Sequence, residues 1–419
     1  MIARWIANLR GEAAIQEENL PNYQNATFES VLTIALLSSL LVMTSYGSHQ
    51  TYPGTSTRPV LSNSEAEILS EENYLQGWSV EGISIPSTPD YSVGSTQTYT
   101  DIQQAVNAAI NAGGTSRKYI AIDPGTYAQS VYVTGSVPLT IYGTGSSPSN
   151  VSIILSQPAD MTVSAYIDQV NPDGSRYSSG DPGYKLYKSC ASKSDTIGTS
   201  CSSIFWITAS NVQVYNLQVT NTYTSNGVGQ SVALKTDADK VRLSTLNLIS
   251  RQDTLYAGSN NDGVVQRVYI DNTYIEGDVD FVFGGAATVF TGVTFKAVSD
   301  RHPSGAIVFA PSTVPGNSYG FLAINSVITA DSTFKSSQKV NLARAWDAGV
   351  SAGDYVADSS PNGQLVIRST EIDLIINADA PYATSTSKRA YSGNNDTSRD
   401  LNDNTYNRFW EYDNTGDGA

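Results

Sequence analysis

Three short blocks between residues 229 and 285 place polar side chains inside apolar, β-rich sequence. The blocks are GQSVAL (229–234), RQDTLYAG (251–258) and GDVDFVFGG (277–285), and their chemically capable residues are Gln230, Gln252, Asp253 and Asp280. An aspartate inside VDFVF is unfavourable as a plain strand residue, because strands disfavour Asp and burial disfavours its charge. A surface position on an exposed strand face is the alternative for Asp280, but it accounts poorly for all four residues together. The pattern therefore indicates a chemically active site.

The spacing of these residues indicates how they meet. Gln252 follows Gln230 by 22 residues and Asp280 follows Asp253 by 27 residues, which are intervals typical of one coil in a repeat architecture. If each interval is one turn of a parallel β-solenoid, neighbouring turns lie roughly 4.7–4.9 Å apart. Two carboxylates and two carboxamides would then share one face and act on the same small group.

These residue types suit the hydrolysis of an ester. The reaction needs a nucleophile, a proton donor for the departing alkoxide and hydrogen-bond donors for the oxyanion. Two close carboxylates cannot both ionise easily, so the pKa of one rises and that group can be an acid near neutral pH. A bidentate contact with Arg344, in the segment LARAW (342–346), can keep the other carboxylate ionised. A Ser-His-Asp mechanism is disfavoured, because the chain has only His49, near its start, and His302, in a turn-like segment before a proline.

The order of these motifs resembles that of the pectin methylesterases. QDTLY is followed by G-x-V-D-F-x-F-G, with G-Q-x-V-A-L upstream and R-x-W, formed by Arg344 and Trp346, downstream. The resemblance extends over most of the chain from Thr100 to Trp346, and the full set of motifs in this order is highly specific. It implies an all-β chain folded as a right-handed parallel β-helix that hydrolyses the methyl esters of pectin without a cofactor.

The resemblance also implies a role for each site residue. Asp280 would be the nucleophile, and Asp253 would be the general acid and then the general base. Gln230 and Gln252 would form the oxyanion hole. Arg344 would orient Asp280 and contact the substrate, which is expected to be methyl-esterified homogalacturonan.

Three aromatic residues, Tyr256, Phe283 and Trp346, are expected by the same matching to line a sugar cleft. Core packing is the alternative for Tyr256 and Phe283. It is less favoured for Trp346, which follows Arg344 by two residues and therefore shares its strand face.

Two alternatives to the esterase stay open. The first is a β-helix enzyme that cleaves the polysaccharide chain: a retaining glycosidase, which two carboxylates about 5 Å apart could serve, or a calcium-dependent lyase. The second is a non-catalytic polysaccharide-binding solenoid. The amide pair Gln230 and Gln252 favours the esterase, because an oxyanion has to be stabilised. The sequence has no compact acidic cluster that indicates a calcium site.

The sequence departs from the family pattern at four positions. A usual glutamate is Gln129, a usual asparagine is Gly285, and the usual glycine and proline on either side of the arginine are Ala343 and Ala345. None of the changes removes a catalytic group. The changes beside Arg344 could shift its strand, so we expect them to bear on rate and specificity more than on reaction type.

The elements that must position the site are short strands. V-x-V or L-x-L pairs followed by Asn or Gly turns recur in residues 100–350, which we expect to form the β-helix. Residues 100–114 are predicted to form a helix, capped by Thr100, that covers the open end of the core. Residues 48–99 are predicted to lie along the outside, and the polar residues 351–419 to pack against the exterior. A solenoid can absorb this length as one domain.

The first 47 residues are predicted to be a leader. Val31–Met43 is an uncharged apolar run of 13 residues, shorter than the roughly 20 residues that a transmembrane helix needs. It suits the core of a signal peptide, and Ser45-Tyr46-Gly47 offers small residues for cleavage. We expect secretion into the extracellular space without stable membrane insertion. A short membrane-associated anchor is the alternative.

The two cysteines, Cys190 and Cys201, lie in an insertion at about residues 172–203. In an oxidising compartment we expect one disulfide between them; two free thiols are the alternative for a cytosolic chain. Two cysteines with two histidines make a zinc site unfavourable, and no metal is expected. The tyrosines in and before the insertion could stack on sugar rings or pack the loop: Tyr166, Tyr177, Tyr184 and Tyr187.

The charge of the chain excludes one class of partner. The formal net charge is −15, and no basic stripe offsets it, so nucleic acid is not an expected partner. A neutral, methyl-esterified polymer would approach without the repulsion that a polyanionic pectin meets. The protein is expected to act as a monomer.

Overall fold

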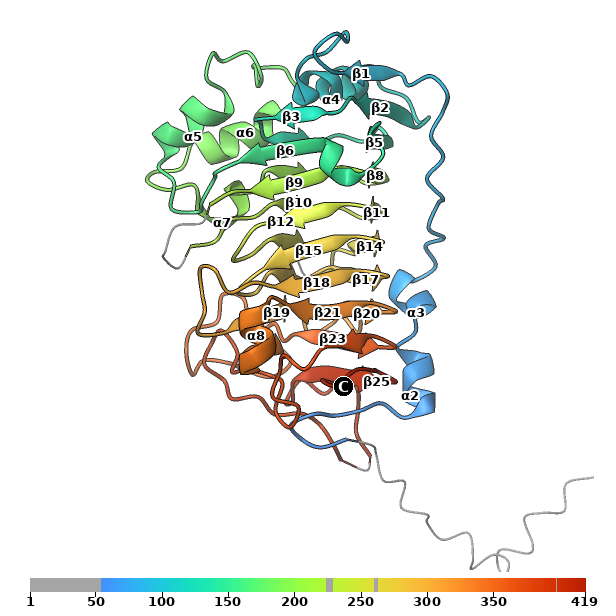
Figure 1. Cartoon of the computed structure of the whole chain (residues 1–419), viewed down its shortest axis with the longest axis vertical. Helices are drawn as coiled ribbons and strands as arrows, with labels where there is room; N and C mark the ends of the chain where they lie inside the picture. The colour runs from blue at the N-terminus through green and yellow to red at the C-terminus, as the bar shows by residue number, and fades with distance from the viewer. Residues whose placement is uncertain (1–53, 224–228, 260–262, 397) are drawn as a thin grey trace, which may run out of the picture. The chain divides into compact units, whose positions relative to one another are not determined.

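The strands of this chain stack into three long parallel sheets around one apolar core (Figure 1). The computed structural model describes residues 54–223, 229–259, 263–396 and 398–419. Each full coil contributes one strand to each sheet, and equivalent strands of successive coils pair in parallel. The predicted parallel β-helix is therefore confirmed.

Ten strands form the first sheet. In order they are β1 (Tyr91–Val93), β2 (Lys118–Ile122), β5 (Leu139–Gly143), β8 (Val212–Tyr215), β11 (Val241–Ser244), β14 (Arg267–Asp271), β17 (Ala287–Thr291), β20 (Phe321–Ile324), β23 (Gln364–Arg368) and β25 (Arg408–Tyr412). Alternate side chains of these strands enter the core, and Val241, Leu243, Val268 and Ile270 are fully buried there.

The second sheet carries the candidate site. Its seven strands are β4 (Val131–Val133), β7 (Phe205–Ile207), β10 (Leu234–Thr236), β13 (Leu255–Ala257), β16 (Val282–Gly284), β19 (Ala306–Pro311) and β22 (Val340–Ala343). The third sheet has eight strands: β3 (Gly125–Tyr127), β6 (Val151–Leu155), β9 (Gln218–Asn221), β12 (Asn247–Ile249), β15 (Tyr274–Gly277), β18 (Thr294–Ala297), β21 (Val327–Ala330) and β24 (Glu371–Ile372).

One turn position recurs between the ten-stranded and the eight-stranded sheet. There the backbone φ is positive in successive coils, at Asn216 (54°), Thr245 (56°), Asn272 (49°), Gly292 (63°), Asn325 (50°) and Ser369 (48°). Gly and Asn adopt this left-handed conformation most readily. The Asn and Gly turns of the sequence thus make the sharp bend that sends the next strand into a different sheet.

Helix α4 (Ile102–Asn111) closes the N-terminal end of the core. The apolar face that it buries consists of Ile102, Ala105, Val106 and Ala109. Its N-cap is Asp101, not the predicted Thr100: the Asp101 carboxylate accepts a hydrogen bond from the Gln104 N–H at 3.2 Å. A carboxylate at this position satisfies an N–H group that the helix itself leaves free.

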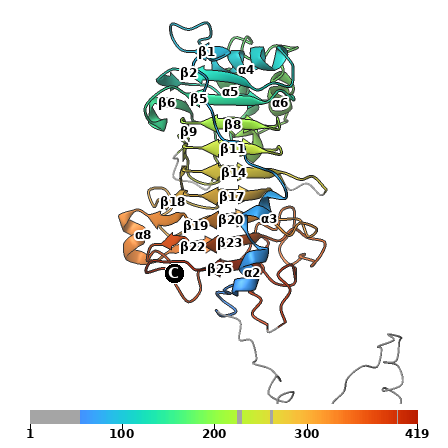
Figure 2. The same cartoon turned by 90° about the vertical axis from the view of Figure 1, so that its right-hand side faces the viewer.

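The other helices of the described residues are short. They are α2 (Asn63–Ile68), α3 (Glu71–Leu75), the 3₁₀ helix η3 (Pro148–Asn150), α5 (Val163–Val170), α6 (Tyr184–Ala191), α7 (Gly198–Cys201) and α8 (Ser332–Ser337). Helices α2 and α3 lie against the outer face of the ten-stranded sheet (Figure 2). Tyr74 of α3 is fully buried there, and its hydroxyl donates a hydrogen bond to the Gln364 side chain at 2.8 Å.

The sheets extend beyond the limits expected for the β-helix. β1 lies before residue 100, and β23, β24 and β25 lie after residue 350. The late strands lie in a polar part of the sequence, so its composition does not reveal the apolar residues that point into the core. Leu365, Ile367 and Phe409 are nevertheless fully buried in the main core. The C-terminal segment therefore forms coils of the solenoid as well as an outer layer.

The predicted leader, residues 1–47, lies outside the described residues. Among the residues that are described, no helix has the length and apolar character needed to cross a membrane.

Candidate active site

Asp253 and Asp280 stand side by side on consecutive coils. Each lies two residues before a strand of the seven-stranded sheet, and Leu255 of β13 pairs with Val282 of β16. The Asp253 N–H donates to the Val279 carbonyl at 3.2 Å, which continues this register back to the two aspartates. Both have a left-handed backbone, with φ of 70° and 50°. Non-glycine residues rarely hold this conformation, and it is enriched at functional sites.

The two glutamines are also brought together. Gln230 and Gln252 form an isolated parallel bridge, one residue out of step with the pairing of Leu234 and Leu255 that follows. The extra residue lies in the Gln230 coil, where the N–H groups of Ala233 and Leu234 both donate to the carbonyl of Thr254. The bridge thus places Gln230 beside Gln252 on consecutive coils, and Gln252 directly precedes Asp253.

Arg344 reaches Asp280 from two strands away. It follows β22, while Asp280 precedes β16, and β19 lies between these strands. The Arg344 side chain spans this gap beside Ala310, a small residue of β19. Its Nε donates to Asp280 Oδ1 at 2.8 Å and its Nη2 donates to Asp280 Oδ2. The pair is bidentate, the arrangement that gives an arginine–carboxylate contact its directional strength.

The two carboxyl groups differ in their electrostatic surroundings. Both side chains are buried, with 7% of each residue exposed. Burial raises the pKa of Asp253 well above its usual range, and the neighbouring charge of Asp280 raises it further. Burial also raises the pKa of Asp280, but the hydrogen bonds and charge of Arg344 oppose that rise. Asp280 therefore ionises first, and Asp253 retains its proton to higher pH.

A cleft of about 420 Å³ opens above these groups. Its lining comprises Lys193, Thr199, Ser200, Gln230, Gln252, Asp253, Tyr256, Asp280, Phe283, Ala310, Arg344, Trp346 and Thr386. Tyr256 and Phe283 stack with ring centroids 4.2 Å apart, and the Trp346 ring meets both edge-on at 5.8 and 5.4 Å. These aromatic residues thus pack on one another and also line the cleft. The predicted cleft position and the alternative of core packing each describe part of their environment.

The insertion supplies one wall of this cleft through Lys193, Thr199 and Ser200. A disulfide joins Cys190 to Cys201 within it, with the Cα atoms 5.7 Å apart. Two of its tyrosines, Tyr177 and Tyr187, are buried in a local cluster with Tyr166, which lies before the insertion, and these three side chains cannot stack on a sugar. Tyr184 is partly buried against the same cluster. Loop packing is therefore the role of the three buried tyrosines.

None of the four residues that depart from the family pattern is among those that line the cleft. The Gln129 side-chain oxygen accepts hydrogen bonds from the N–H groups of Ile102 and Gln103 at 3.0 and 3.2 Å, so it caps α4. The N–H of Gly285 donates to the Gly258 carbonyl. Ala343 and Ala345 are fully buried on either side of Arg344. Arg344 and Trp346 still donate their N–H groups to Phe309 and Pro311 at 3.0 Å, so the strand keeps its register.

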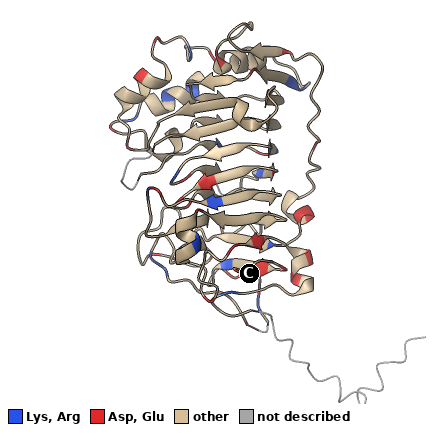
Figure 3. Ribbon diagram, in the orientation of Figure 1, with Lys and Arg blue, Asp and Glu red and all other residues tan. Residues whose placement is uncertain are grey.

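Several lining residues escaped the sequence analysis. Ala310, Lys193, Thr199, Ser200 and Thr386 carry no motif, and only the folding of distant coils brings them to the cleft. Within the described ranges, no group of three or more His, Cys, Asp or Glu side chains is arranged to hold a metal ion. Charged residues are sparse along the stacked strands (Figure 3).

Comparison with known proteins places these features in a family. The family model described as Pectinesterase matches residues 180–350. A pectinesterase of Sitophilus oryzae is 52% identical over 388 residues, which cover 92% of this chain and 99% of that protein. The chain belongs to the pectinesterase family. The family prediction made from the motifs is thereby confirmed, and the protein is an esterase of that family.

Solved structures of the family share the fold. The structure of rice weevil pectin methyl esterase superposes with a TM-score of 0.85 at 53% identity, covering 88% of this chain and all of that one. This agrees with the right-handed form of the β-helix that the resemblance implied. An Escherichia coli relative, called a putative acyl-CoA thioester hydrolase, is 38% identical over 89% of this chain and 91% of its own length. The chain is thus also similar to a protein that is named for the hydrolysis of a thioester.

Proposed function

We propose that this pectinesterase family member removes methyl groups from the uronate esters of pectin and releases methanol. The observation that carries the proposal is the unequal pair of stacked carboxyl groups. Arg344 makes a bidentate contact with Asp280, and the pKa of Asp253 is raised by burial and by the Asp280 charge. An ionised nucleophile beside a protonated acid is what cleavage of an unactivated ester requires.

In the proposed mechanism an Asp280 oxygen attacks the ester carbonyl carbon. The developing oxyanion accepts hydrogen bonds from the side-chain amides of Gln230 and Gln252. The bond from carbon to the methoxy oxygen then breaks, and Asp253 gives its proton to that oxygen, so methanol leaves. The product is an anhydride between Asp280 and the uronate.

Hydrolysis of this intermediate returns the enzyme to its starting state. Asp253, now ionised, takes a proton from a water molecule, and the resulting hydroxide forms a bond to the anhydride carbonyl carbon. Asp280 departs as a carboxylate, which Arg344 stabilises. The uronic acid leaves and ionises by giving its proton to the solvent, and one water has been consumed for each methanol released. The half-buried Trp346 is proposed to contact the sugar rings, with the more deeply buried Tyr256 and Phe283 packed against it at the base of the cleft.

One assay separates this function from its alternatives. On highly methylated pectin the purified protein is expected to release methanol without new reducing ends and without unsaturated uronates. New reducing ends indicate a glycosidase, and unsaturated products indicate a lyase. No product despite binding indicates a polysaccharide-binding solenoid. An acyl-CoA thioester is included as a second substrate, because one relative bears that name.

The site of action is proposed to be outside the cell. The apolar run at residues 31–43 and the Cys190–Cys201 disulfide support an oxidising, extracellular location. N-terminal sequencing of the protein recovered from culture medium tests this: a start near residue 48 supports cleavage of a leader, and retention of the protein inside the cell contradicts secretion. The monomeric state stays a prediction, which sedimentation velocity can check.

A further inference from the structure

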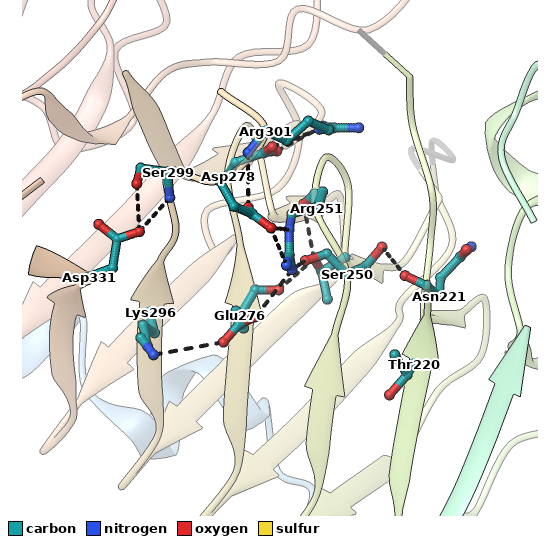
Figure 4. Close-up of polar contacts among 12 residues, drawn as sticks. Thr220, Asn221, Ser250, Arg251, Glu276, Asp278, Lys296, Ser299, Arg301 and Asp331 are labelled. Atoms are coloured by element: carbon teal, nitrogen blue, oxygen red, sulfur yellow. Dashed lines mark hydrogen bonds and ion pairs between the residues drawn. The ribbon is translucent and has the colours of Figure 1, made fainter. Parts of the chain in front are cut away.

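The segment between β18 and β19 crosses the coils that carry the candidate catalytic residues. Two adjacent residues of this segment, Asp300 and Arg301, bind side chains or backbone groups next to Gln230, Gln252 and Asp280. Figure 4 shows Asp278 pointing to Arg301, with Arg251, Glu276 and Ser250 beside them. These contacts lie behind the cleft, and none of Asp278, Arg251 or Arg301 is among its lining residues.

Arg301 makes three hydrogen bonds in a fully buried setting. Its Nε and Nη2 donate to the two carboxylate oxygens of Asp278 at 2.8 and 2.9 Å. Its Nη1 donates to the Gly229 carbonyl at 2.8 Å. The side chains of Arg301 and Asp278 are 3% and 0% exposed. Gly229 precedes Gln230, and Asp278 lies two residues before Asp280. One guanidinium therefore joins the coil that carries Gln230 to the coil that carries Asp280.

The middle coil is held from the same segment. Arg251, which precedes Gln252, donates from Nε and Nη2 to Asp300 Oδ2 at 3.0 and 2.7 Å. Its Nη1 also donates to Glu276 at 3.1 Å. The Asp278 N–H donates to the Arg251 carbonyl at 3.3 Å, which links this contact to the first one. All three coils therefore meet at Asp300 and Arg301.

We propose that the Arg301–Asp278 pair is a positioning device for the reaction, fixing Gln230 and Asp280 relative to each other. Neither residue touches the substrate; each acts through the backbone next to a catalytic residue. A buried ion pair adds little net stability, because desolvation of two charges offsets their attraction. What it supplies here is a fixed geometry across coils that carry two left-handed aspartates and a one-residue bulge beside Gln230. The inference rests on the function proposed above.

The pair also contributes to the electrostatic field at Asp253, after burial, Asp280 and Arg344. The charged groups that face Asp253 are Asp280 and Asp278 from the turn between β15 and β16, Arg344 after β22 and Arg301 after β18. The Asp278 charge raises the pKa of Asp253, and the Arg301 charge lowers it. Removing the Asp278 charge leaves Arg301 unbalanced, and both effects favour ionisation of Asp253.

Two substitutions separate geometry from charge. Asp278→Asn keeps the size of the side chain and removes its charge. Arg301→Lys keeps the charge, but an ammonium group has no planar fork that could pair with both Asp278 oxygens and also reach the Gly229 carbonyl. We expect each to lower kcat for methanol release roughly tenfold or more, with KM within about twofold because the aromatic lining is unchanged. In Asp278→Asn the alkaline limb of the pH–kcat profile should also move to lower pH, because the loss of the Asp278 charge lowers the pKa of Asp253. In Arg301→Lys that limb should stay in place.

A matched control is another buried ion pair, between Glu65 and Arg399, that lies away from the cleft. Glu65 is a buried carboxylate that accepts two hydrogen bonds from Arg399 at 2.7 and 2.6 Å, away from the cleft. Glu65→Gln should lower Tm about as much as Asp278→Asn and leave kcat unchanged. Folded Asp278→Asn and Arg301→Lys variants whose kcat stays within about twofold of wild type overturn the proposal. If Asp278→Asn does not fold, Arg301→Lys alone decides it. A wild-type protein that releases no methanol instead overturns the proposed function itself.

Discussion

Asp253 and Asp280 occupy equivalent places on consecutive coils, in the same left-handed conformation, and Arg344 makes its bidentate contact with Asp280. This contact makes two chemically identical side chains unequal. Without it, two buried carboxyl groups on neighbouring coils would compete for one proton with no fixed outcome. With it, the ionised form is favoured at Asp280 and the protonated form at Asp253. The expected outcomes below follow from this asymmetry and from the walls of the cleft.

Asp280→Asn and Asp253→Asn are each expected to abolish methanol release, with a loss of roughly a thousandfold or more. The first removes the nucleophile, and the second removes the proton that the departing methoxide needs. Both substitutions keep the shape of the side chain, so circular dichroism should match wild type. Wild-type-like turnover in either variant would remove the proposed mechanism.

Arg344→Lys should lower activity at least tenfold, because an ammonium group cannot reproduce a planar two-pronged contact with a carboxylate. The acidic limb of the pH–rate profile should move to higher pH, since a weaker partner lets the pKa of Asp280 rise. Initial rates on methylated pectin across the pH range measure both effects. A loss smaller than about threefold would mean that the contact with Asp280 does not govern the reaction.

Asp253→Asn should also stabilise the protein at neutral pH. The pKa of Asp253 is raised in the folded state, so its favourable contribution is complete below the unfolded pKa and is lost as pH rises through the folded pKa. An amide avoids the cost of burying a charge at high pH. We expect its Tm to exceed that of wild type by roughly one to three degrees at pH 8. The difference should vanish near pH 3; a constant difference at all pH values contradicts this account.

Trp346→Ala should raise KM for pectin more than it lowers kcat. Trp346 is half-buried and lines the cleft, so its ring has an open edge for a sugar, whereas Phe283 is buried beneath it. Loss of one aromatic contact corresponds to roughly a tenfold rise in KM. Phe283→Ala serves as the comparison, because it should mainly lower Tm by leaving a cavity. Equal effects of the two variants on KM and Tm would show that Trp346 only packs.

The Cys190–Cys201 disulfide should persist in the mature protein. Peptide mapping without reductant is expected to give one linked pair. Replacing both cysteines by serine should cost about 2–3 kcal/mol in the chain-entropy model, and should disturb the wall that carries Lys193 and Ser200. Activity should fall together with Tm. Two thiols that react freely with an alkylating reagent before reduction would contradict the disulfide and weaken the proposal of secretion.

The sequence alone determined the coil architecture and predicted which polar residues would gather at one place. Coil length, alternating apolar residues and Asn or Gly turns are local patterns, so the parallel β-helix can be read without coordinates. The order of the motifs indicated the family, and Gln230, Gln252, Asp253, Asp280 and Arg344 all line one cleft. The apolar positions of α4 were also readable, although its capping residue was off by one, because Thr100 and Asp101 both suit an N-cap.

Only the tertiary structure showed which contacts connect one coil to the next. The one-residue bulge beside Gln230, the reach of Arg344 past Ala310 and the joining of Gly229 to Asp278 through Arg301 depend on which side chains meet after stacking. The burial of the insertion tyrosines and the strands beyond residue 350 were hidden for the same reason. Spacing along a solenoid gives the coil on which a residue lies. The length and direction of a side chain decide what it reaches on the next coil, and only the packed structure fixes both.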